Sequence, residues 1–256
     1  MDDFASALRG RDPVVGTWLS IGHPAVAEIV ATADLDFVVV DTEHAPTGLE
    51  SVANVLRAVE AAEGDTAALA RVAWNDPVRV KRLLDTGPAG LVVPMVESAE
   101  EAREAVAAMR YPPEGVRGIA AARATDYTTG FESYVETANE HLLTVLQVES
   151  GVAAERAAAI GDVDGVDALF VGPADLSASL GAFPDADDER VGAAVDRVVA
   201  GGEAADVPVG TLVVDPANVD DWLDRGMDYL VVGLDAAFLA DGASAAVDAF
   251  ADAVDR

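Results

Sequence analysis

Two carboxylates follow apolar segments in the second half of the chain. Glu149 ends the segment Leu143–Glu149, and Asp175 comes three residues after the segment Ala168–Gly172. Carboxylate oxygens are ligands that Mg²⁺ and Mn²⁺ prefer, and two of them leave positions for water or a substrate. Zinc suits the pair less, because the chain has no cysteine and no pair of histidines beside these acids. The alternative is that Asp175 caps the turn that follows it and that Glu149 pairs with an arginine.

A histidine follows another apolar segment. His44 comes three residues after Asp41, which ends the segment Phe37–Asp41. An imidazole titrates near neutral pH, so His44 can take a proton and return it, and Asp41 is spaced to orient the ring. The other two histidines, His23 and His141, are interpreted as a loop residue and a helix-end residue. We therefore take His44 as the candidate base.

Arg71 ends the segment Ala67–Arg71. At a strand end its guanidinium can bind a carboxylate and stabilise negative charge that develops during a reaction. The alternative is a salt bridge with one of the nearby acids. Gly172, Pro173 and Ala174 offer small side chains and backbone groups, which let a ligand approach closely. These residues complete the set of candidate site groups.

Lys81 is the only lysine of the chain. Some aldolases form a Schiff base between a lysine and the substrate carbonyl. Lys81, however, lies in an expected helix that Asn75-Asp76-Pro77 opens, away from any strand end. Carbanion chemistry on this chain therefore needs a metal rather than a lysine.

Eight short apolar segments, alternating with Ala-rich amphipathic ones, must position these groups. Nearly continuous runs of Val, Leu and Ile suit parallel strands buried on both faces. The alternation predicts an α/β fold, a closed (β/α)₈ TIM barrel formed as a single domain by residues 1–256, with its chemistry at the carboxyl ends of the strands. An open doubly wound sheet is the alternative. The expected strands are Val14–Leu19, Phe37–Asp41, Ala67–Arg71, Leu91–Pro94, Leu143–Glu149, Ala168–Gly172, Val207–Val213 and Tyr229–Gly233, and the clearest helices are Leu49–Ala62, Ala99–Met109, Val152–Ile160 and Arg190–Gly202.

Two further segments carry expectations about shape. Arg110–His141 is the only long connection without a strand, and it contains Tyr111-Pro112-Pro113 and a piece rich in Gly, Ala and Thr. It predicts a loop over the mouth of the barrel, followed by a helix. The acidic, Ala-rich stretch Ala243–Val254 predicts a final helix that packs on this barrel or on that of a neighbour.

The composition excludes several classes of partner. A formal net charge of −30 disfavours nucleic acid and anionic lipid, which would both be repelled. The sequence contains no run of 18 or more uncharged apolar residues, which a membrane-spanning helix would need. The acidic start lacks the features of a secretory signal. The absence of cysteine removes disulfides and thiolate chemistry. We expect a cytoplasmic enzyme with a small-molecule substrate and with neither nucleic acid nor membrane as a partner.

The charge itself suggests an adaptation to salt. Aspartate outnumbers glutamate, and apart from the histidines every basic residue except Lys81 is arginine. Excess carboxylates keep a surface hydrated, and dissolved salt screens their mutual repulsion. We therefore hypothesise a halophilic protein.

Several motifs, in order and at matching spacing, give the chain a family resemblance. It resembles the pyruvate-forming class II aldolases of the HpcH/HpaI family from about residue 14 to residue 240. The motifs are Asp41-Thr42-Glu43-His44-Ala45-Pro46, Arg71 with Trp74-Asn75-Asp76-Pro77, Val93-Pro94-Met95-Val96, Arg110-Tyr111-Pro112-Pro113, Gly115-Val116-Arg117-Gly118, Gln147-Val148-Glu149 and Val171-Gly172-Pro173-Ala174-Asp175-Leu176-Ser177.

The resemblance implies a role for each site residue. Glu149 and Asp175 are expected to bind a divalent metal that chelates the 2-oxo acid, without an organic cofactor. Gln147 and the backbone of Gly172-Pro173-Ala174 are expected to hold the same acid. Arg71 is expected to stabilise the enolate, while His44, steered by Asp41, acts as base on the substrate hydroxyl.

Asp85 matches a family residue thought to raise the basicity of this histidine, within the chain or across a subunit contact. The resemblance also implies a homo-oligomer, a hexamer built as a trimer of dimers that exchange their last helix. The chain departs from the pattern after Arg117-Gly118, where Ile119–Tyr127 replaces a longer loop. That departure leaves the aldehyde partner open.

Three other functions compete with cleavage of a 4-hydroxy-2-oxo acid. A relative that cleaves 2-keto-3-deoxy sugar acids differs only in the aldehyde released. A citrate- or malyl-CoA lyase shares the fold and the metal chemistry but calls for basic residues around the nucleotide phosphates. A non-catalytic barrel used for binding would not need His44, Arg71, Glu149 and Asp175 together.

Overall fold

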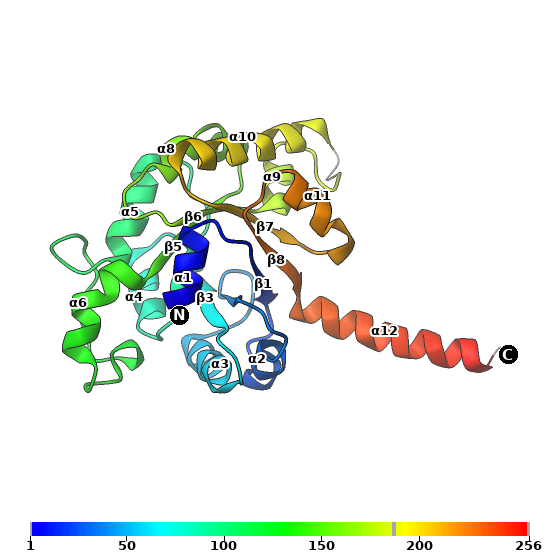
Figure 1. The fold of residues 1–256 in the computed structure, drawn as a ribbon, viewed down its shortest axis with the longest axis horizontal. Coiled ribbons are helices and arrows are strands. Elements are labelled where there is room, and N and C mark those ends of the chain that lie inside the picture. The colour runs from blue at the N-terminus through cyan, green and yellow to red at the C-terminus, as the bar shows by residue number, and fades with distance from the viewer. Residues whose placement is uncertain (1, 186–187, 255–256) are drawn as a thin grey trace.

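Eight parallel strands close into a barrel in the computed structural model, which describes residues 2–185 and 188–254. Each strand pairs with the next one along the chain, and β8 pairs with β1, so the closed barrel is confirmed and the open sheet is excluded (Figure 1). The strands are β1 (Val14–Leu19), β2 (Phe37–Asp41), β3 (Ala67–Arg71), β4 (Gly90–Val93), β5 (Leu143–Val148), β6 (Ala168–Val171), β7 (Val209–Val213) and β8 (Tyr229–Leu234).

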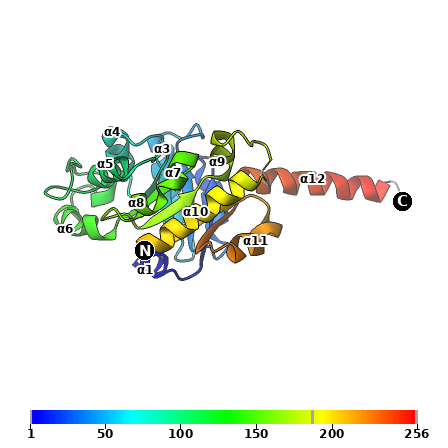
Figure 2. The same ribbon diagram turned by 90° about the horizontal axis from the view of Figure 1, so that it is seen from above.

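Helices surround the barrel, and the last helix leaves it. In both views α12 extends away from the barrel as a long arm (Figures 1 and 2). The helices are α1 (Asp2–Arg9), α2 (Pro24–Ala31), α3 (Leu49–Ala61), α4 (Pro77–Leu84), α5 (Ala99–Met109), α6 (Phe131–His141), α7 (Gly151–Glu155), α8 (Ala157–Gly161), α9 (Pro173–Ser179), α10 (Glu189–Ala205), α11 (Val219–Asp224) and α12 (Asp235–Val254), with 3₁₀ turns η1 (Arg123–Thr125) and η2 (Pro216–Asn218).

The strands are buried on both faces because their side chains alternate between two cores. Phe37 and Val39 of β2 belong to the core inside the barrel, while Val38 and Val40 belong to the core between the strands and the helices. Helix α1 adds Phe4 to the inner core, where its ring stacks on Phe37 at 4.9 Å between centroids. Each such buried side chain contributes about 1.5–3 kcal/mol of hydrophobic stabilisation.

The predicted strands agree closely with the observed ones, and three other predictions need correction. The first three strands have the expected bounds, whereas β7 begins at Val209, because Pro208 has no N–H with which to join the ladder. The helix expected over Val152–Ile160 is two helices, since Arg156 leaves the helical region with φ −113° and ψ 8°. The final helix begins at Asp235, eight residues before the predicted start at Ala243.

The third correction concerns the connection Arg110–His141. It joins the end of α5 to the start of β5, so it lies at the amino ends of the strands and not over the mouth of its own barrel. Two hydrogen bonds fix it to the end of α4: Ala124 N donates to Asp85 O at 3.2 Å, and Arg123 Nη1 donates to Thr86 O at 2.7 Å. The expected helix is present as α6.

Within the described residues, no helix combines the length and the apolar character needed to cross a membrane.

Candidate active site at the carboxyl ends of the strands

Glu149 is the buried acid of the barrel mouth, the face formed by the carboxyl ends of the strands. Its side chain follows β5 and is almost fully covered. Met95 N donates to Oε1 at 2.7 Å, and Gln147 Nε2 donates to Oε2. The Met95 backbone adopts φ +56°, a left-handed conformation rare for a side chain of this kind, and in it the N–H reaches the carboxylate. Burial raises the pKa of Glu149, and the nearby charge of Asp175 adds to the rise.

Gly172 leaves room for this carboxylate. A β-carbon at position 172 would lie 3.0 Å from both Glu149 Oε2 and Gln147 Nε2. The strand register accounts for the approach, because Val148 pairs with Val171 and so brings the end of β5 beside the residue that follows β6. The predicted role of Gly172 as a residue of close approach therefore has a geometric basis.

Asp175 lies in the first turn of α9 with an exposed side chain. The N-cap of that helix is Gly172, so Asp175 is not the cap that the alternative reading required. Pro173 opens the helix and Ala174 follows it, so the expected small segment runs from Gly172, beside Glu149, to Asp175. Glu149, for its part, accepts hydrogen bonds from Met95 and Gln147 rather than an arginine.

The donor set fits a hard divalent cation. Among residues 2–185 and 188–254 no cluster of three or more His, Asp or Glu side chains could hold a metal. Glu149 and Asp175 would therefore supply two oxygen ligands, and water or a substrate would supply the rest. Gln147 Oε1 is buried without a hydrogen-bond partner in the described structure, so this site has an acceptor ready for a bound group.

Arg71 is held in place on three sides. Its Nε and Nη2 donate to Asp41 Oδ1 and Oδ2 at 2.9 and 2.8 Å, and Nη1 lies 2.7 Å from Glu43 Oε2. The guanidinium carbon lies 4.7 Å above the ring of Trp18. Nε and Nη2 are thus hydrogen-bonded to Asp41, while Nη1 forms an ion pair with Glu43. The predicted salt bridge is thus present, and it orients the cation at the mouth.

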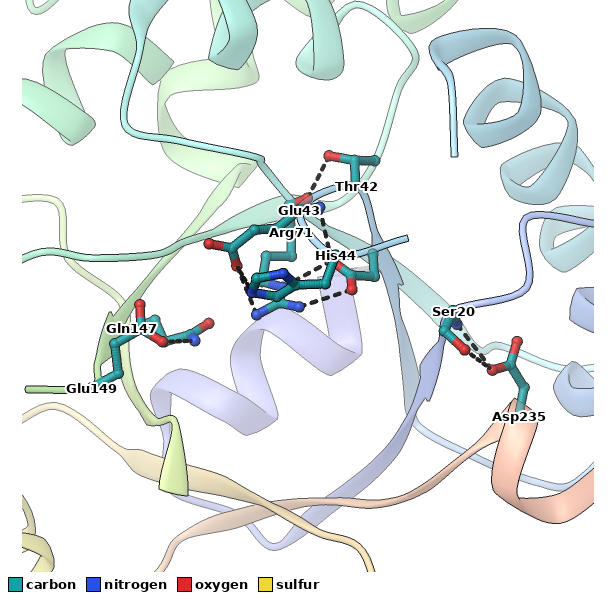
Figure 3. Close-up of polar contacts among 9 residues, drawn as sticks. Ser20, Thr42, Glu43, His44, Arg71, Gln147, Glu149 and Asp235 are labelled. Carbon is teal, nitrogen blue, oxygen red and sulfur yellow. Dashed lines mark hydrogen bonds and ion pairs between the residues drawn. The ribbon is translucent and has the colours of Figure 1, made fainter. Parts of the chain in front are cut away.

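His44 stands at the same edge of the barrel but is not paired with Asp41, which corrects the predicted dyad. The Asp41 carboxylate accepts hydrogen bonds from Arg71 at both oxygens. Its Oδ1 also accepts from Glu43 N, at an N–O distance of 2.9 Å. Burial alone would raise the pKa of Asp41, but the hydrogen bonds and charge of Arg71 bring it below its usual value. The His44 ring is 69% exposed, and its Nε2 lies 3.9 Å from Glu43 Oε2 (Figure 3).

Asp85 lies at the other end of the barrel. It follows α4, whose carboxyl end is near the amino ends of the strands, and its Oδ1 accepts from Arg117 Nη2 at 3.2 Å. Arg117 is buried, with its guanidinium carbon 4.5 Å from the Tyr111 ring centre and 5.7 Å from that of Tyr134. A role for Asp85 on the histidine of its own chain is therefore excluded by position.

The two other histidines and the single lysine lie where the sequence predicts them. His23 is the N-cap of α2, and its Nδ1 accepts from Ala25 N at 3.2 Å. His141 ends α6, and Lys81 lies within α4, away from the strand ends.

The sequence reading missed four residues of the mouth. Trp18 packs against Arg71, and Met95 donates its backbone N–H to Glu149. Such contacts cannot be predicted from the residue type. Glu43 lies inside the motif that carries His44, and Asp235 follows β8, so both were open to the strand-end rule applied to the other acids. Asp235 is buried and accepts from Ser20 Oγ at 2.7 Å, on the far side of the mouth from Glu149 (Figure 3).

The model of the HpcH/HpaI aldolase/citrate lyase family matches residues 15–241. This chain belongs to that family. The family resemblance seen in the motifs is thereby confirmed, together with the expectation of a lyase of the aldolase type.

Relatives of known structure or name agree with this membership. The 4-hydroxy-2-oxo-heptane-1,7-dioate aldolase of Salmonella arizonae is 40% identical over 94% of this chain and 92% of its own length. An HpcH/HpaI aldolase/citrate lyase family protein from Burkholderia cenocepacia is 36% identical with a TM-score of 0.94, over 98% of this chain and 99% of that one. An HpcH/HpaI aldolase from Desulfitobacterium hafniense is 31% identical with a TM-score of 0.87, over 96% and 95%.

Proposed function

We propose that this chain is a class II aldolase that cleaves a 4-hydroxy-2-oxo acid, or a 2-keto-3-deoxy sugar acid, to pyruvate and an aldehyde. The observation that carries the proposal is Glu149, a buried carboxylate beside Asp175 that faces the cation Arg71 across the barrel mouth. A buried acid next to a second acid is costly unless a cation joins them. We propose Mg²⁺ or Mn²⁺ as that cation, with no organic cofactor.

The metal would be held by Glu149 and Asp175 and would polarise the keto and carboxylate oxygens of the bound acid. Gln147 would hold the same acid through its amide N–H groups, one of which donates to Glu149 Oε2, while its unpartnered Oε1 could accept from a metal-bound water. The backbone at Gly172, Pro173 and Ala174 would contact it as well, since Gly172 lies against Gln147 and Glu149 and leads into α9. These groups would fix the 2-oxo acid half of the substrate.

Different residues would transfer the proton and stabilise the negative charge. His44 would take the proton of the C4 hydroxyl, which lets the C3–C4 bond break and the aldehyde leave. The electron pair of that bond moves to the 2-oxo acid half, where the remaining N–H groups of Arg71 would stabilise the negative charge. Return of that proton from the His44 imidazolium to C3, directly or through water, then gives pyruvate. Asp41 contributes by holding Arg71.

The diacid cleaved by the named relatives is the substrate to test first. 4-Hydroxy-2-oxo-heptane-1,7-dioate combines the required 2-oxo acid and C4 hydroxyl with a second carboxylate. A CoA thioester lyase is the weaker candidate, because nucleotide phosphates would meet a chain with a net charge of −30.

The exposed arm supports a homo-oligomer. Helix α12 carries exposed apolar side chains, among them Phe238, Leu239 and Phe250. Beside β1 and β8, Ile29 of α2 and Leu223 of α11 are also exposed. We propose that α12 of a second copy covers the exposed apolar side chains of α2 and α11. The resulting dimers would assemble into a hexamer.

In such an assembly Asp85 could act only on the site of another copy, since it lies at the opposite end of its own barrel from His44. Light scattering in high salt should then give a mass six times that of the 26.3-kDa chain. Phe250→Asp should release smaller species, whereas a monomeric wild-type chain would contradict the assembly.

The decisive assay measures pyruvate release. It compares 4-hydroxy-2-oxo acids with 3-deoxy-2-oxo sugar acids, at high salt, in metal-stripped protein and after addition of Mg²⁺ or Mn²⁺. We expect release with at least one acid only when the metal is present. If no acid of either class yields pyruvate, the proposed function is wrong while the fold stands.

A further inference from the structure

The geometry points to Glu43 as the residue that positions the His44 imidazole for proton transfer. This inference rests on the proposed function and adds to it a positioning residue. Glu43 follows β2 and Thr42, and its side chain is 13% exposed, so it is a largely buried acid at the edge of the mouth.

Glu43 stands between the proposed base and the proposed charge-stabilising cation. Its Oε2 lies 2.7 Å from Arg71 Nη1 and 3.9 Å from His44 Nε2. Figure 3 shows the three side chains gathered at one edge of the mouth, with the Gln147–Glu149 pair across from them. One carboxylate therefore faces both an arginine that is fixed and an imidazole that is not.

The ion pair with Arg71 orients the Glu43 carboxylate, and backbone hydrogen bonds hold the turn that carries Glu43. Glu43 N donates to Asp41 Oδ1 at 2.9 Å. The preceding Thr42 donates to Arg71 O from its N at 3.1 Å and from Oγ1 at 2.7 Å. The turn that carries Glu43 is thus fastened to the end of β3, and the ion pair with Arg71 holds its carboxylate toward the mouth.

His44 needs such a partner because its ring is largely in solvent. The side chain is 69% exposed, and within the described residues Glu43 supplies its one ion-pair contact. A fixed carboxylate restricts the orientation of an imidazole and stabilises the cation that forms when the ring accepts a proton. Asp41, which the spacing suggested for this task, is occupied by Arg71 and by Glu43 N.

The test compares Glu43→Gln with Glu43→Asp in the pyruvate-release assay. Glutamine keeps the length and volume but loses the charge, and aspartate keeps the charge but is too short to reach both partners. We expect each variant to lower kcat by about 10- to 100-fold, as misplacement of a catalytic group does. KM for the 2-oxo acid should change by less than about 3-fold, because Glu43 does not hold that half of the substrate. Glu203→Gln, an exposed acid on α10, is the matched control.

A double-mutant cycle asks whether Glu43 acts through His44. In a His44→Ala background, Glu43→Gln should lower kcat by less than about 3-fold, since the group that it positions is gone. In the single variant, Mn²⁺ affinity by calorimetry should match the wild type, and the unfolding midpoint should fall no further than that of Asp41→Asn, because Arg71 keeps its two hydrogen bonds to Asp41. These two measurements separate a positioning role from a metal-site role and from a purely structural one.

The outcomes that overturn the inference are distinct. Three results would each disprove the positioning role alone. They are wild-type kcat in Glu43→Gln, an equally large fall in kcat from Glu43→Gln in the His44→Ala background, and a loss of Mn²⁺ affinity of tenfold or more. A wild-type protein that releases no pyruvate from any acid would sink the proposed function and this inference with it.

Discussion

The guanidinium of Arg71 is oriented by two acids and an indole, and this arrangement makes Asp41 a structural partner of the site. Asp41 and Arg71 are directly opposed in the β2–β3 register, and the ion pair between them is almost fully buried. Removing one partner of a buried pair leaves the other charge uncompensated, which is strongly destabilising. The pair therefore couples stability at the mouth to the protonation of Asp41.

We predict that Asp41→Asn lowers the free energy of unfolding at neutral pH by about 1–3 kcal/mol. The pKa of Asp41 is lowered in the folded state from an ordinary value of 3.8. Its stabilisation is therefore complete above that value and is lost as pH falls through the lower folded-state pKa. Denaturant unfolding of the metal-free chain should show the gap between wild type and variant closing in acid.

Asp162→Asn, a change of an exposed acid after α8, serves as the control and should show no such gap. A gap that stayed constant from neutral to acid pH would mean that the Asp41 charge does not stabilise the fold.

The types of the site residues could be predicted from sequence, but their pairings could not. The strand-end rule found Asp41, His44, Arg71 and Glu149, because each follows a recognisable apolar segment. Which acid faces which cation depends on strand register and on the path of the turn, both of which are set by contacts distant in sequence. Spacing in the sequence therefore predicts a contact of Asp41 with the histidine three residues away, whereas its partner in the structure is the arginine 30 residues away.

At the scale of elements, the junction of β8 and α12 depends on one buried acid. Asp235 accepts from Ser20 N at 2.9 Å, Ser20 Oγ at 2.7 Å and Ile21 N at 2.8 Å. These bonds tie the segment after β1 to the residue where α12 begins. Asp235 therefore helps to close the barrel at the point where the arm leaves it.

Asp235→Ala should lower the free energy of unfolding by about 1–3 kcal/mol, because partly buried N–H groups at Ser20 and Ile21 lose their acceptor. Asp248→Ala, in the exposed part of the same helix, is the matched control and should stay within about 0.5 kcal/mol of wild type. Equal stability of the two variants in thermal or denaturant unfolding would rule out this role for Asp235.

Helix and loop positions show where sequence patterns stop being informative. The Ala-rich composition of Val152–Ile160 predicts one helix, yet Arg156 breaks it, and its guanidinium donates to Glu97 O at 3.2 Å. The loop before α6 was expected at the mouth because of its composition. Its place is set instead by topology, since any segment between a helix and the next strand returns to the amino ends of the strands.

At the scale of the whole molecule, the net charge of −30 opposes folding in dilute buffer. Salt screens repulsion between exposed carboxylates, with a Debye length that falls from about 10 Å at 0.1 M to about 3 Å at 1 M. We predict that the unfolding midpoint of the wild-type chain rises from low to molar KCl. A midpoint that is highest in dilute buffer would contradict adaptation to salt.

The most direct test of the account is the metal dependence that Glu149 confers. Wild type and Glu149→Gln are stripped of metal, and Mn²⁺ binding is measured by calorimetry alongside pyruvate release from 4-hydroxy-2-oxo-heptane-1,7-dioate. We predict that the wild type binds Mn²⁺ and regains activity with it, while Glu149→Gln, which keeps the size of the side chain, loses both. Undiminished Mn²⁺ binding and pyruvate release in Glu149→Gln would contradict a metal-dependent aldolase that uses Glu149.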